Sequence, residues 1–380
     1  MYRETELLQV GDTSADWKGA VNPPVYHASL FSFESLQHFR DYVSGEAQHY
    51  AYTRVANPTT KVLEQKIAFL EKAEDAVAVA SGMAAITTTL LTLLHAGDHL
   101  LVADCTYGRG FCTQRLASLG VEVETFSSDE TSDLSARIRP NTRVIYLESP
   151  GGGGFCPIQD LRAVARVARR NDVTTIIDNT WATPLYQNPI ELGIDIVLHS
   201  VSKYIGGHSD LVMGLVVGST DLIAQVRKMA LHLGGTPSPS DAYLAVRGLR
   251  TLPIRMARHQ ESAFRVARWL ESRPEIQKVW YPGLESFPGH ELSKTQMTGY
   301  SGLFSFEMPW CGWEAKHCFV DSLLSIFRLG YSWGGFESLV LPSLTKHEGQ
   351  ELDRYRLSIG LEHPEDLVAC LEKALEAWDQ

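Results

Sequence analysis

One lysine of the sequence lies where an apolar run gives way to a glycine-rich turn. Lys203 follows the run Asp195–Leu198 and precedes Gly206–Gly207, and the hydroxyl side chains of Ser200 and Ser202 come just before it. A lysine at the end of a buried strand is partly removed from water, which lowers its pKa and leaves an amine that can act as a nucleophile. A solvated lysine in an ordinary loop would show the same pattern, so this turn alone does not decide between the two interpretations.

A carboxylate precedes this lysine by one strand. Asp178 ends the apolar run Thr174–Ile177, and adjacent parallel strands would place Asp178 and Lys203 in one crevice at their carboxyl ends. The pair could be only a salt bridge. A Schiff-base lysine and a carboxylate that faces a pyridinium nitrogen are, however, the pair that pyridoxal phosphate enzymes use. The carboxylate keeps the ring nitrogen protonated, so that the ring can accept electrons from a substrate carbanion.

Pyridoxal phosphate also needs an anion site and a group that covers its ring. Gly82 and Met83 follow Ser81 where an apolar run ends and an Ala- and Leu-rich helix begins, so backbone N–H groups and the helix dipole could hold a phosphate. Tyr107 follows the next apolar run, where its ring could stack on a cofactor. A helix cap and a core tyrosine would explain these features singly. Together with the lysine and the aspartate, in this order, they predict a pyridoxal phosphate site.

The elements that must position these residues form a strand–helix rhythm. Short apolar runs alternate with helical stretches, which is typical of a mostly parallel sheet with helices on both faces. The runs are residues 76–80, 99–103, 144–147, 174–177, 195–198 and 211–217, and residues 161–170 are one of the helical stretches. Most of these runs end in a polar or small residue, at the edge where open α/β sheets bind ligands: Ser81, Asp104, Glu148, Asp178 and Ser200.

The pattern predicts three parts of the chain. Residues 1–45 look irregular and form an N-terminal arm, and residues 46–240 form the large cofactor-binding domain. Residues 241–380 form a smaller α/β domain, with strand-like runs at Gly302–Glu307 and Tyr355–Ile359 and a last helix that begins near Pro364.

Composition excludes several classes of function. Lys and Arg number 34 and Asp and Glu 45, so the formal net charge is −11, which disfavours nucleic acid and polybasic membrane binding. The 6 cysteines show no zinc spacing, so we expect reduced thiols and no metal site. No apolar run approaches the ~20 residues of a membrane span. We therefore expect a cytoplasmic protein that acts on small molecules.

Over essentially its whole length, the sequence resembles the Cys/Met-metabolism group of pyridoxal phosphate enzymes, which have the aspartate-aminotransferase fold (fold type I). The resemblance is carried by residues 52–54, 57–59, 80–86, 178–184, 199–210 and 233–239. It implies a pyridoxal 5'-phosphate cofactor, an amino-acid substrate and a large cofactor domain followed by a smaller C-terminal domain. It also implies a dimer with shared active sites, usually paired into a homotetramer.

The resemblance assigns roles residue by residue. It implies that Lys203 carries the cofactor and moves the substrate proton, that Asp178 pairs the ring nitrogen, and that Tyr107 stacks on the ring and is the second catalytic residue. It assigns phosphate binding to Gly82, Met83, Ser200 and Ser202, and contact with the neighbouring subunit's phosphate to Tyr52 and Arg54. Substrate binding falls to Tyr331, Ser332 and Arg356.

Departures from the family pattern favour one branch. Gly152 replaces the Asn that commonly bonds the ring hydroxyl, as in cystathionine β-lyases of the enterobacterial type, and Tyr331 stands where γ-acting relatives often carry Glu. These features predict α,β-elimination of cystathionine, or of another S-substituted cysteine, to a thiol, pyruvate and ammonia, as in methionine biosynthesis and transsulfuration. Arg109, two residues after Tyr107, departs from the usual Tyr-Gly-Gly-Thr and has no assigned role.

Other functions remain open at this stage. The same family contains cystathionine and methionine γ-lyases and γ-replacement synthases. Ser332 also lies in a Gly-x-Ser-x-Gly pattern, so a serine hydrolase with Asp353 and His363 is a distant alternative. A binding protein on a catalytically dead scaffold would be expected to lack Lys203 or Asp178, and both are present.

Overall fold

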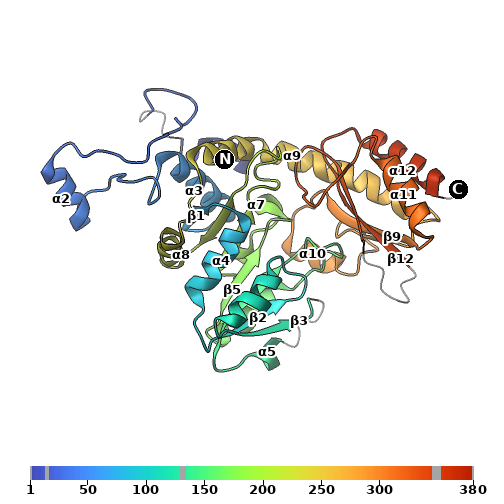
Figure 1. The fold of residues 1–380 in the computed structure, drawn as a ribbon, viewed down its shortest axis with the longest axis horizontal. Coiled ribbons are helices and arrows are strands. Elements are labelled where there is room, and N and C mark those ends of the chain that lie inside the picture. Colours follow the sequence, from blue (N-terminus) through green and yellow to red (C-terminus); the bar gives the residue numbers. More distant parts are fainter. Residues whose placement is uncertain (1, 13–16, 129–133, 345–351, 379–380) are drawn as a thin grey trace.

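The computed structural model describes residues 2–12, 17–128, 134–344 and 352–378, which form two sheets, their covering helices and an extended N-terminal arm (Figure 1). The first part comprises α1 (Arg3–Gln9), α2 (Leu36–Ser44), α3 (Pro58–Glu71), β1 (Asp75–Val79), α4 (Gly82–Leu93), β2 (His99–Ala103), η1 (Phe111–Leu116), β3 (Glu122–Phe126), α5 (Leu134–Arg137) and β4 (Thr142–Glu148). Next come α6 (Leu161–Arg170), β5 (Thr174–Asp178), α7 (Thr183–Tyr186), η3 (Pro189–Leu192), β6 (Ile196–Ser200), β7 (Gly214–Gly218), α8 (Thr220–Leu233) and α9 (Pro239–Glu271). The chain closes with β8 (Lys278–Trp280), α10 (His290–Gln296), β9 (Leu303–Pro309), α11 (Trp313–Leu323), β10 (Arg328–Leu329), β11 (Leu339–Pro342), β12 (Leu352–Ser358) and α12 (Pro364–Trp378).

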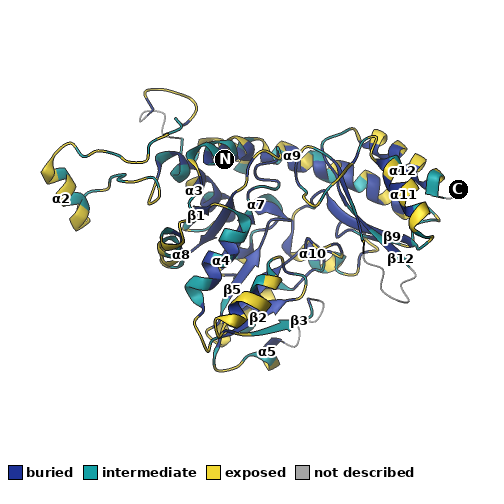
Figure 2. Ribbon diagram, viewed as in Figure 1, coloured by how far each residue is buried: buried dark blue, intermediate teal, exposed yellow. Residues whose placement is uncertain are grey.

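The larger sheet has 7 strands in the order β1-β7-β6-β5-β4-β2-β3. The pairs from β3 to β6 are parallel, and β7 runs antiparallel to both of its neighbours. The predicted α/β fold with a mostly parallel sheet is confirmed. Its central strands are buried on both faces (Figure 2), which is why they consist of unbroken apolar runs.

Helices cover both faces of this sheet. One face packs against α3, α6 and the first half of α9, and the other against α4, α8 and η1. Several of these helices begin at a side-chain cap. The hydroxyl of Ser81 accepts the N–H of Ala84 at 3.0 Å at the start of α4, and Asp160 accepts that of Ala163 at 2.9 Å at the start of α6. Strand ends and helix starts therefore meet along one edge of the sheet.

The second sheet has 5 strands in the order β10-β11-β12-β9-β8. Its centre is β12, which pairs antiparallel with β9 and β11. The runs predicted as strands at Gly302–Glu307 and Tyr355–Ile359 correspond to β9 and β12, and α12 begins at Pro364 as expected. The long helix α9 contributes to the cores of both sheets, and the domain division at residue 240 stays a prediction.

The N-terminal arm projects away from the rest of the molecule, with α2 at its far end (Figure 1). The prediction that residues 1–45 are irregular was incomplete, because α1 and α2 lie within them. The Ser35 hydroxyl caps α2, and Gly45 ends it in the left-handed conformation with φ +82°. Among the described residues, no helix combines the length and apolar character that a membrane span requires.

Candidate active site

Lys203 lies in the turn after β6, half-buried, with its amine beside an aromatic ring. Its Nζ donates to Ser332 Oγ at 2.9 Å and lies 5.5 Å from the ring centre of Trp333. Burial and the nearby Arg356 guanidinium lower the pKa of Lys203, and Asp178 opposes this effect. A larger fraction of this amine is therefore deprotonated near neutral pH than for a lysine in water.

Asp178 ends β5, the strand parallel to β6, as predicted. Its Oδ1 accepts hydrogen bonds from the backbone N–H and the hydroxyl of Thr180, and the same hydroxyl accepts the N–H of Ser200 at 2.8 Å. In the described part of the chain, no donor bonds its Oδ2. Burial raises the pKa of Asp178, whereas the hydrogen bonds from Thr180 and the nearby His199 and Lys203 side chains oppose the rise. This carboxylate is held rigidly and keeps one oxygen for a ligand.

The N-terminus of α4 and the end of β6 form a close-fitting cradle. A Cβ added at Gly82 would lie 2.9 Å from the Cβ of Ser200, so the two backbones approach as closely as a glycine allows. The N–H groups of Gly82 and Met83 lie in the first helical turn, which has no intrahelical acceptors. Ser202 lies beyond, and its Oγ accepts the N–H of Met213 at 3.2 Å. This cradle fits an anionic group such as a phosphate.

Tyr107 follows β2 in a turn that packs on the same helix start. A Cβ added at the next residue, Gly108, would lie 3.2 Å from Ile86 and 3.7 Å from the sulfur of Met83. The backbone carbonyl of Tyr107 accepts the hydroxyl of Tyr146 at 3.0 Å, while its own side chain is 62% exposed. The ring is thus free to cover a planar ligand that sits between this turn and the strand ends.

Arg356 approaches from the second sheet, where it lies on β12. Its Nη1 donates to the carbonyl of Gly152 at 3.3 Å, and its Nη2 donates to the carbonyls of Ser332 at 3.3 Å and of Tyr331. Burial lowers the pKa of Arg356, although the guanidinium still carries its charge near neutral pH. Tyr331 itself is 80% exposed, so Trp333 is the aromatic residue that flanks the lysine.

The site also contains a residue to which the sequence assigned no role. Glu148 ends β4, in register with Asp178. Its carboxyl accepts the N–H of Tyr107 and the N–H of Gly152, both at 2.6 Å. The sequence shows Glu148 only as one of several polar residues at the ends of strands. What distinguishes it from the others is that two N–H groups remote in sequence donate to its carboxyl.

Helix α9 supports the site from behind. The buried Arg255 donates to the carbonyls of Tyr204 at 2.7 Å and Ile205 at 3.3 Å, directly after Lys203. One helical turn later, the ring of His259 bonds the carbonyl of Ile359 at 2.8 Å, at the end of β12. The lysine turn and the strand that carries Arg356 are therefore both fixed to one helix.

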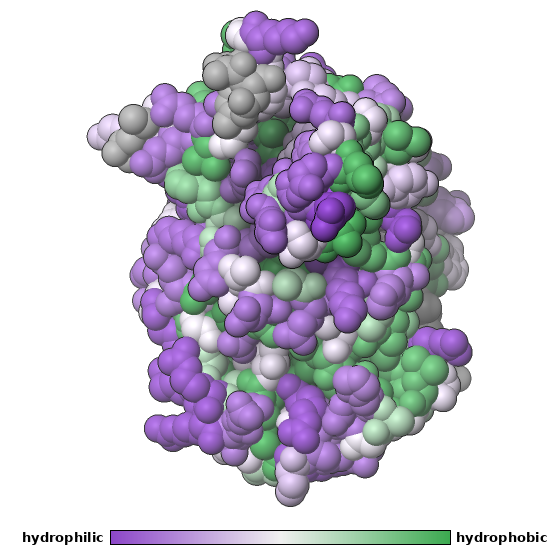
Figure 3. Space-filling view, turned by 90° about the vertical axis from the view of Figure 1, so that its left-hand side faces the viewer, coloured by the Kyte–Doolittle hydropathy of each residue, from purple (hydrophilic) through white to green (hydrophobic). Residues whose placement is uncertain are grey.

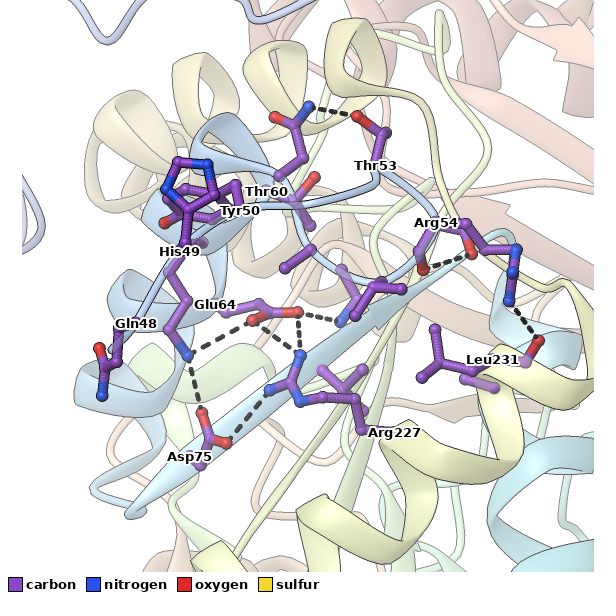
Figure 4. A pocket seen from close by; sticks show the side chains of 18 of the residues that line it. Gln48, His49, Tyr50, Thr53, Arg54, Thr60, Glu64, Asp75, Arg227 and Leu231 are labelled. Carbon is purple, nitrogen blue, oxygen red and sulfur yellow. Dashed lines mark hydrogen bonds and ion pairs between the residues drawn. The ribbon is translucent and has the colours of Figure 1, made fainter. Parts of the chain in front are cut away.

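Tyr52 and Arg54 lie apart from this cluster. Arg54 stacks on the Tyr52 ring, and its Nη1 donates to the carbonyl of Leu231 at 3.3 Å, near the end of α8. Arg54 also lines a cavity of about 840 Å³ between the arm and α3, β1 and α8. Figure 4 shows Arg227 between Glu64 and Asp75 on the wall of this cavity. The guanidinium lies 3.0 Å from a Glu64 oxygen and 3.1 Å from an Asp75 oxygen. Lys203 does not line this cavity, so the predicted chemistry is elsewhere.

The geometry does not support a serine hydrolase at Ser332. Its hydroxyl accepts a hydrogen bond from Lys203, whereas a nucleophilic serine would donate one to an imidazole nitrogen. Asp353 pairs with Lys316 at 2.6 Å inside the second sheet's core, and His363 Nδ1 bonds the N–H at the start of α12. These residues form no relay to the serine.

A mostly parallel sheet with a lysine at one strand end, a carboxylate at the next and an open helix N-terminus beside them defines a class of protein. It is the class of pyridoxal-phosphate-dependent enzymes of fold type I.

The chain belongs to the family described as Cys/Met metabolism PLP-dependent enzyme, whose model matches residues 4–376, and the cofactor of this family is pyridoxal phosphate. It is 41% identical, over 94% of both chains, to the L-methionine gamma-lyase of Fusobacterium nucleatum subsp. polymorphum. It is 37% identical, over 98% of both, to the cystathionine beta-lyase of Lactococcus lactis subsp. cremoris. Its fold matches a cystathionine gamma synthase from Xanthomonas oryzae pv. oryzae with a TM-score of 0.92 and 35% identity, over 100% of this chain and 99% of that one.

Proposed function

We propose that this enzyme is a carbon–sulfur β-lyase that cleaves cystathionine, or another S-substituted cysteine, to a thiol, pyruvate and ammonia. The proposal rests on the side chains that flank the Lys203 amine. Trp333 lies 5.5 Å from the lysine amine, and Ser332 holds that amine at 2.9 Å. A bulky neutral wall favours a substrate that breaks its bond at the β-carbon, because γ-elimination needs a second proton removed farther along the chain.

The residues of the site fit the parts of this reaction. Pyridoxal phosphate, when bound, supplies an electron sink for negative charge at the substrate α-carbon. Lys203 would carry the cofactor and remove the α-proton, which its lowered pKa favours. Asp178 would hold the proton on the ring nitrogen, and Tyr107 would cover the ring. Gly82, Met83, Ser200 and Ser202 would hold the phosphate.

The substrate carboxylate would bind the Arg356 guanidinium, whose planar fork matches a carboxylate with two hydrogen bonds. Ser332 and the exposed Tyr331 would line the entrance. The carbon–sulfur bond at the β-carbon then breaks, its electron pair leaves with sulfur, and the thiolate takes up a proton. Hydrolysis of the remaining three-carbon fragment releases pyruvate and ammonia, and the thiol released from cystathionine is homocysteine.

The test is the identity of the oxo acid released from cystathionine. Pyruvate with homocysteine supports the proposal, and Lys203→Ala is the blank that should release neither. Mainly 2-oxobutyrate with cysteine would assign γ-elimination, the type of activity for which the L-methionine gamma-lyase relative is named. Cystathionine formed from cysteine and an activated homoserine would assign γ-replacement.

We also propose that the active unit is a dimer with shared sites, paired into a homotetramer. Tyr52 and Arg54 do not reach the lysine cluster of their own chain, although the family resemblance assigns them to a phosphate. The arm that precedes them projects outward with exposed apolar residues such as Leu36 and Val43, and apolar patches lie between hydrophilic ones on the face seen in Figure 3.

Subunit complementation tests the shared site. Lys203→Ala and Arg54→Ala homodimers should each be inactive or weak. After denaturation and joint refolding, mixed dimers contain one site with both native residues, so about a quarter of the wild-type activity should return. No recovery, in a sample shown to contain mixed dimers, would place Arg54 in its own chain's site or outside any site.

A further inference from the structure

We infer that Glu148 is a positioning residue of this site: its carboxyl joins the Tyr107 turn to the loop at residues 150–154, and it fills the space that a side chain at position 152 would need. Glu148 is buried at the end of β4. Its Oε2 accepts the N–H of Tyr107 and its Oε1 accepts the N–H of Gly152, so both oxygens are engaged. One carboxyl therefore fixes two segments that are remote in sequence.

These two segments bear on opposite ends of the substrate site. The N–H of Gly152 donates to the Glu148 carboxyl, and the carbonyl of Gly152 accepts a hydrogen bond from Arg356 Nη1 at 3.3 Å. The contacts thus form a continuous series from Tyr107, through Glu148 and Gly152, to Arg356. A shift of the Glu148 carboxyl moves the ring-covering turn and the carboxylate-binding guanidinium at the same time.

The same geometry accounts for glycine at position 152. A Cβ added there would lie 2.9 Å from Glu148 Oε1 and 3.6 Å from the ring of Trp333. The Glu148 carboxyl can yield only by breaking a 2.6 Å hydrogen bond, because both of its oxygens are held. A side chain at position 152 would therefore press on the Glu148 clamp, and glycine at this position, where the family resemblance leads one to expect Asn, leaves the clamp its room.

The chemistry of the clamp requires a carboxyl group. Burial and the charge of Asp178 raise the pKa of Glu148 to about 8, while the two N–H donors and Arg356 oppose the rise. In either protonation state the group keeps an acceptor for each N–H. A glutamine would offer one acceptor oxygen and one NH₂ donor, so it could satisfy only one of the two N–H groups.

The experiment enlarges the side chain at position 152 and shortens the one at position 148, first separately and then together. Gly152→Ala should push the carboxyl out of place, and Glu148→Asp should withdraw it by one methylene. Combined, Glu148→Asp and Gly152→Ala no longer collide. The matched control is Glu64→Asp, since Glu64 is also a buried glutamate that accepts a backbone N–H, from Ala78 at 3.0 Å, but lines the cavity beside the arm instead.

Glycine serves as the probe of the carboxylate site, and its binding is read from the change in the absorbance of the bound cofactor. We expect Gly152→Ala to weaken glycine about tenfold, the scale of one lost hydrogen bond. The double variant should bind glycine within about threefold of Glu148→Asp alone, so the two changes are non-additive. The Glu64→Asp control should leave glycine affinity unchanged, even if it lowers the melting temperature.

Two results would overturn the inference: unchanged glycine affinity in Gly152→Ala, or losses that simply add in the double variant. If Gly152→Ala does not fold, Glu148→Gln takes its place and should weaken glycine by a similar factor without loss of bound cofactor. The inference rests on the proposed function only in assigning the substrate carboxylate to Arg356. The glycine titration needs no turnover, so a wrong assignment of β-elimination would appear in the oxo-acid assay and leave this result unaffected.

Discussion

Arg356→Lys tests the proposed carboxylate site most directly. In the structure the two Nη atoms of Arg356 lie against the carbonyls of Gly152 and Ser332, each at 3.3 Å. A guanidinium in this position can turn a planar pair of donors to a carboxylate, whereas a lysine offers a single ammonium on a shorter, more mobile chain. The substitution removes one charge-assisted hydrogen bond of about 2 kcal/mol. That loss corresponds to a fall in kcat/KM of roughly 30-fold.

The assay measures kcat/KM on cystathionine together with the affinity for glycine, read from cofactor absorbance. Arg265→Lys is the matched control, because Arg265 also makes a two-pronged contact, with Glu365 at 2.8 and 3.0 Å, but on the exposed surface between α9 and α12. It should leave both quantities unchanged. An Arg356→Lys enzyme that keeps wild-type kcat/KM and glycine affinity would refute the assignment of this residue to the substrate carboxylate.

Three further predictions follow from the site and its supports. Lys203→Ala should abolish turnover while Lys228→Ala, at an exposed position of α8, should not; measurable product from the first variant would mean that another group takes the proton. Gly82→Ala should weaken pyridoxal phosphate at least about tenfold in a fluorescence titration of apoprotein, since its Cβ would lie 2.9 Å from Ser200; equal affinity would remove α4 from the phosphate site. Burial lowers the pKa of His259 to about 4. As the pH falls, this histidine therefore binds its proton at a higher pH in the unfolded chain than in the folded one. The free energy of unfolding should fall by up to about 3 kcal/mol between about pH 6.5 and pH 4. His259→Gln should flatten that fall in melting temperature and the exposed His95→Gln should not; parallel curves for all three proteins would contradict this linkage.

Sequence patterns predicted the central strands because strands buried on both faces contain continuous apolar runs, as in residues 100–103. They missed β3, where Glu122 and Glu124 alternate with apolar residues at the edge of the sheet, so the run does not look buried. They also missed α9, because Gly248 and Pro253 interrupt the helical pattern. The structure explains Gly248, since a Cβ there would lie 2.3 Å from the carbonyl of Ile205.

The positions of site residues were predictable to the extent that strand ends set them. Asp178 and the Lys203 turn follow adjacent parallel strands, so their proximity follows from the pattern of runs alone. The role of Glu148 depends on where the turn at Tyr107 and the loop at Gly152 come to rest, and loop conformations leave no periodic signal. The same holds for Trp333, which lies beside the lysine while Tyr331 faces solvent.

The way α9 is anchored has a consequence for how the molecule comes apart. On consecutive turns it holds the backbone after Lys203 through Arg255 and the end of β12 through His259, and its 33 residues contribute to the cores of both sheets. The helix therefore fixes the distance between the Lys203 amine and the Arg356 guanidinium. A fragment ending at residue 240 would lack the apolar residues of α9 that cover one face of the larger sheet. We therefore expect the two sheets and their helices to unfold in a single cooperative transition.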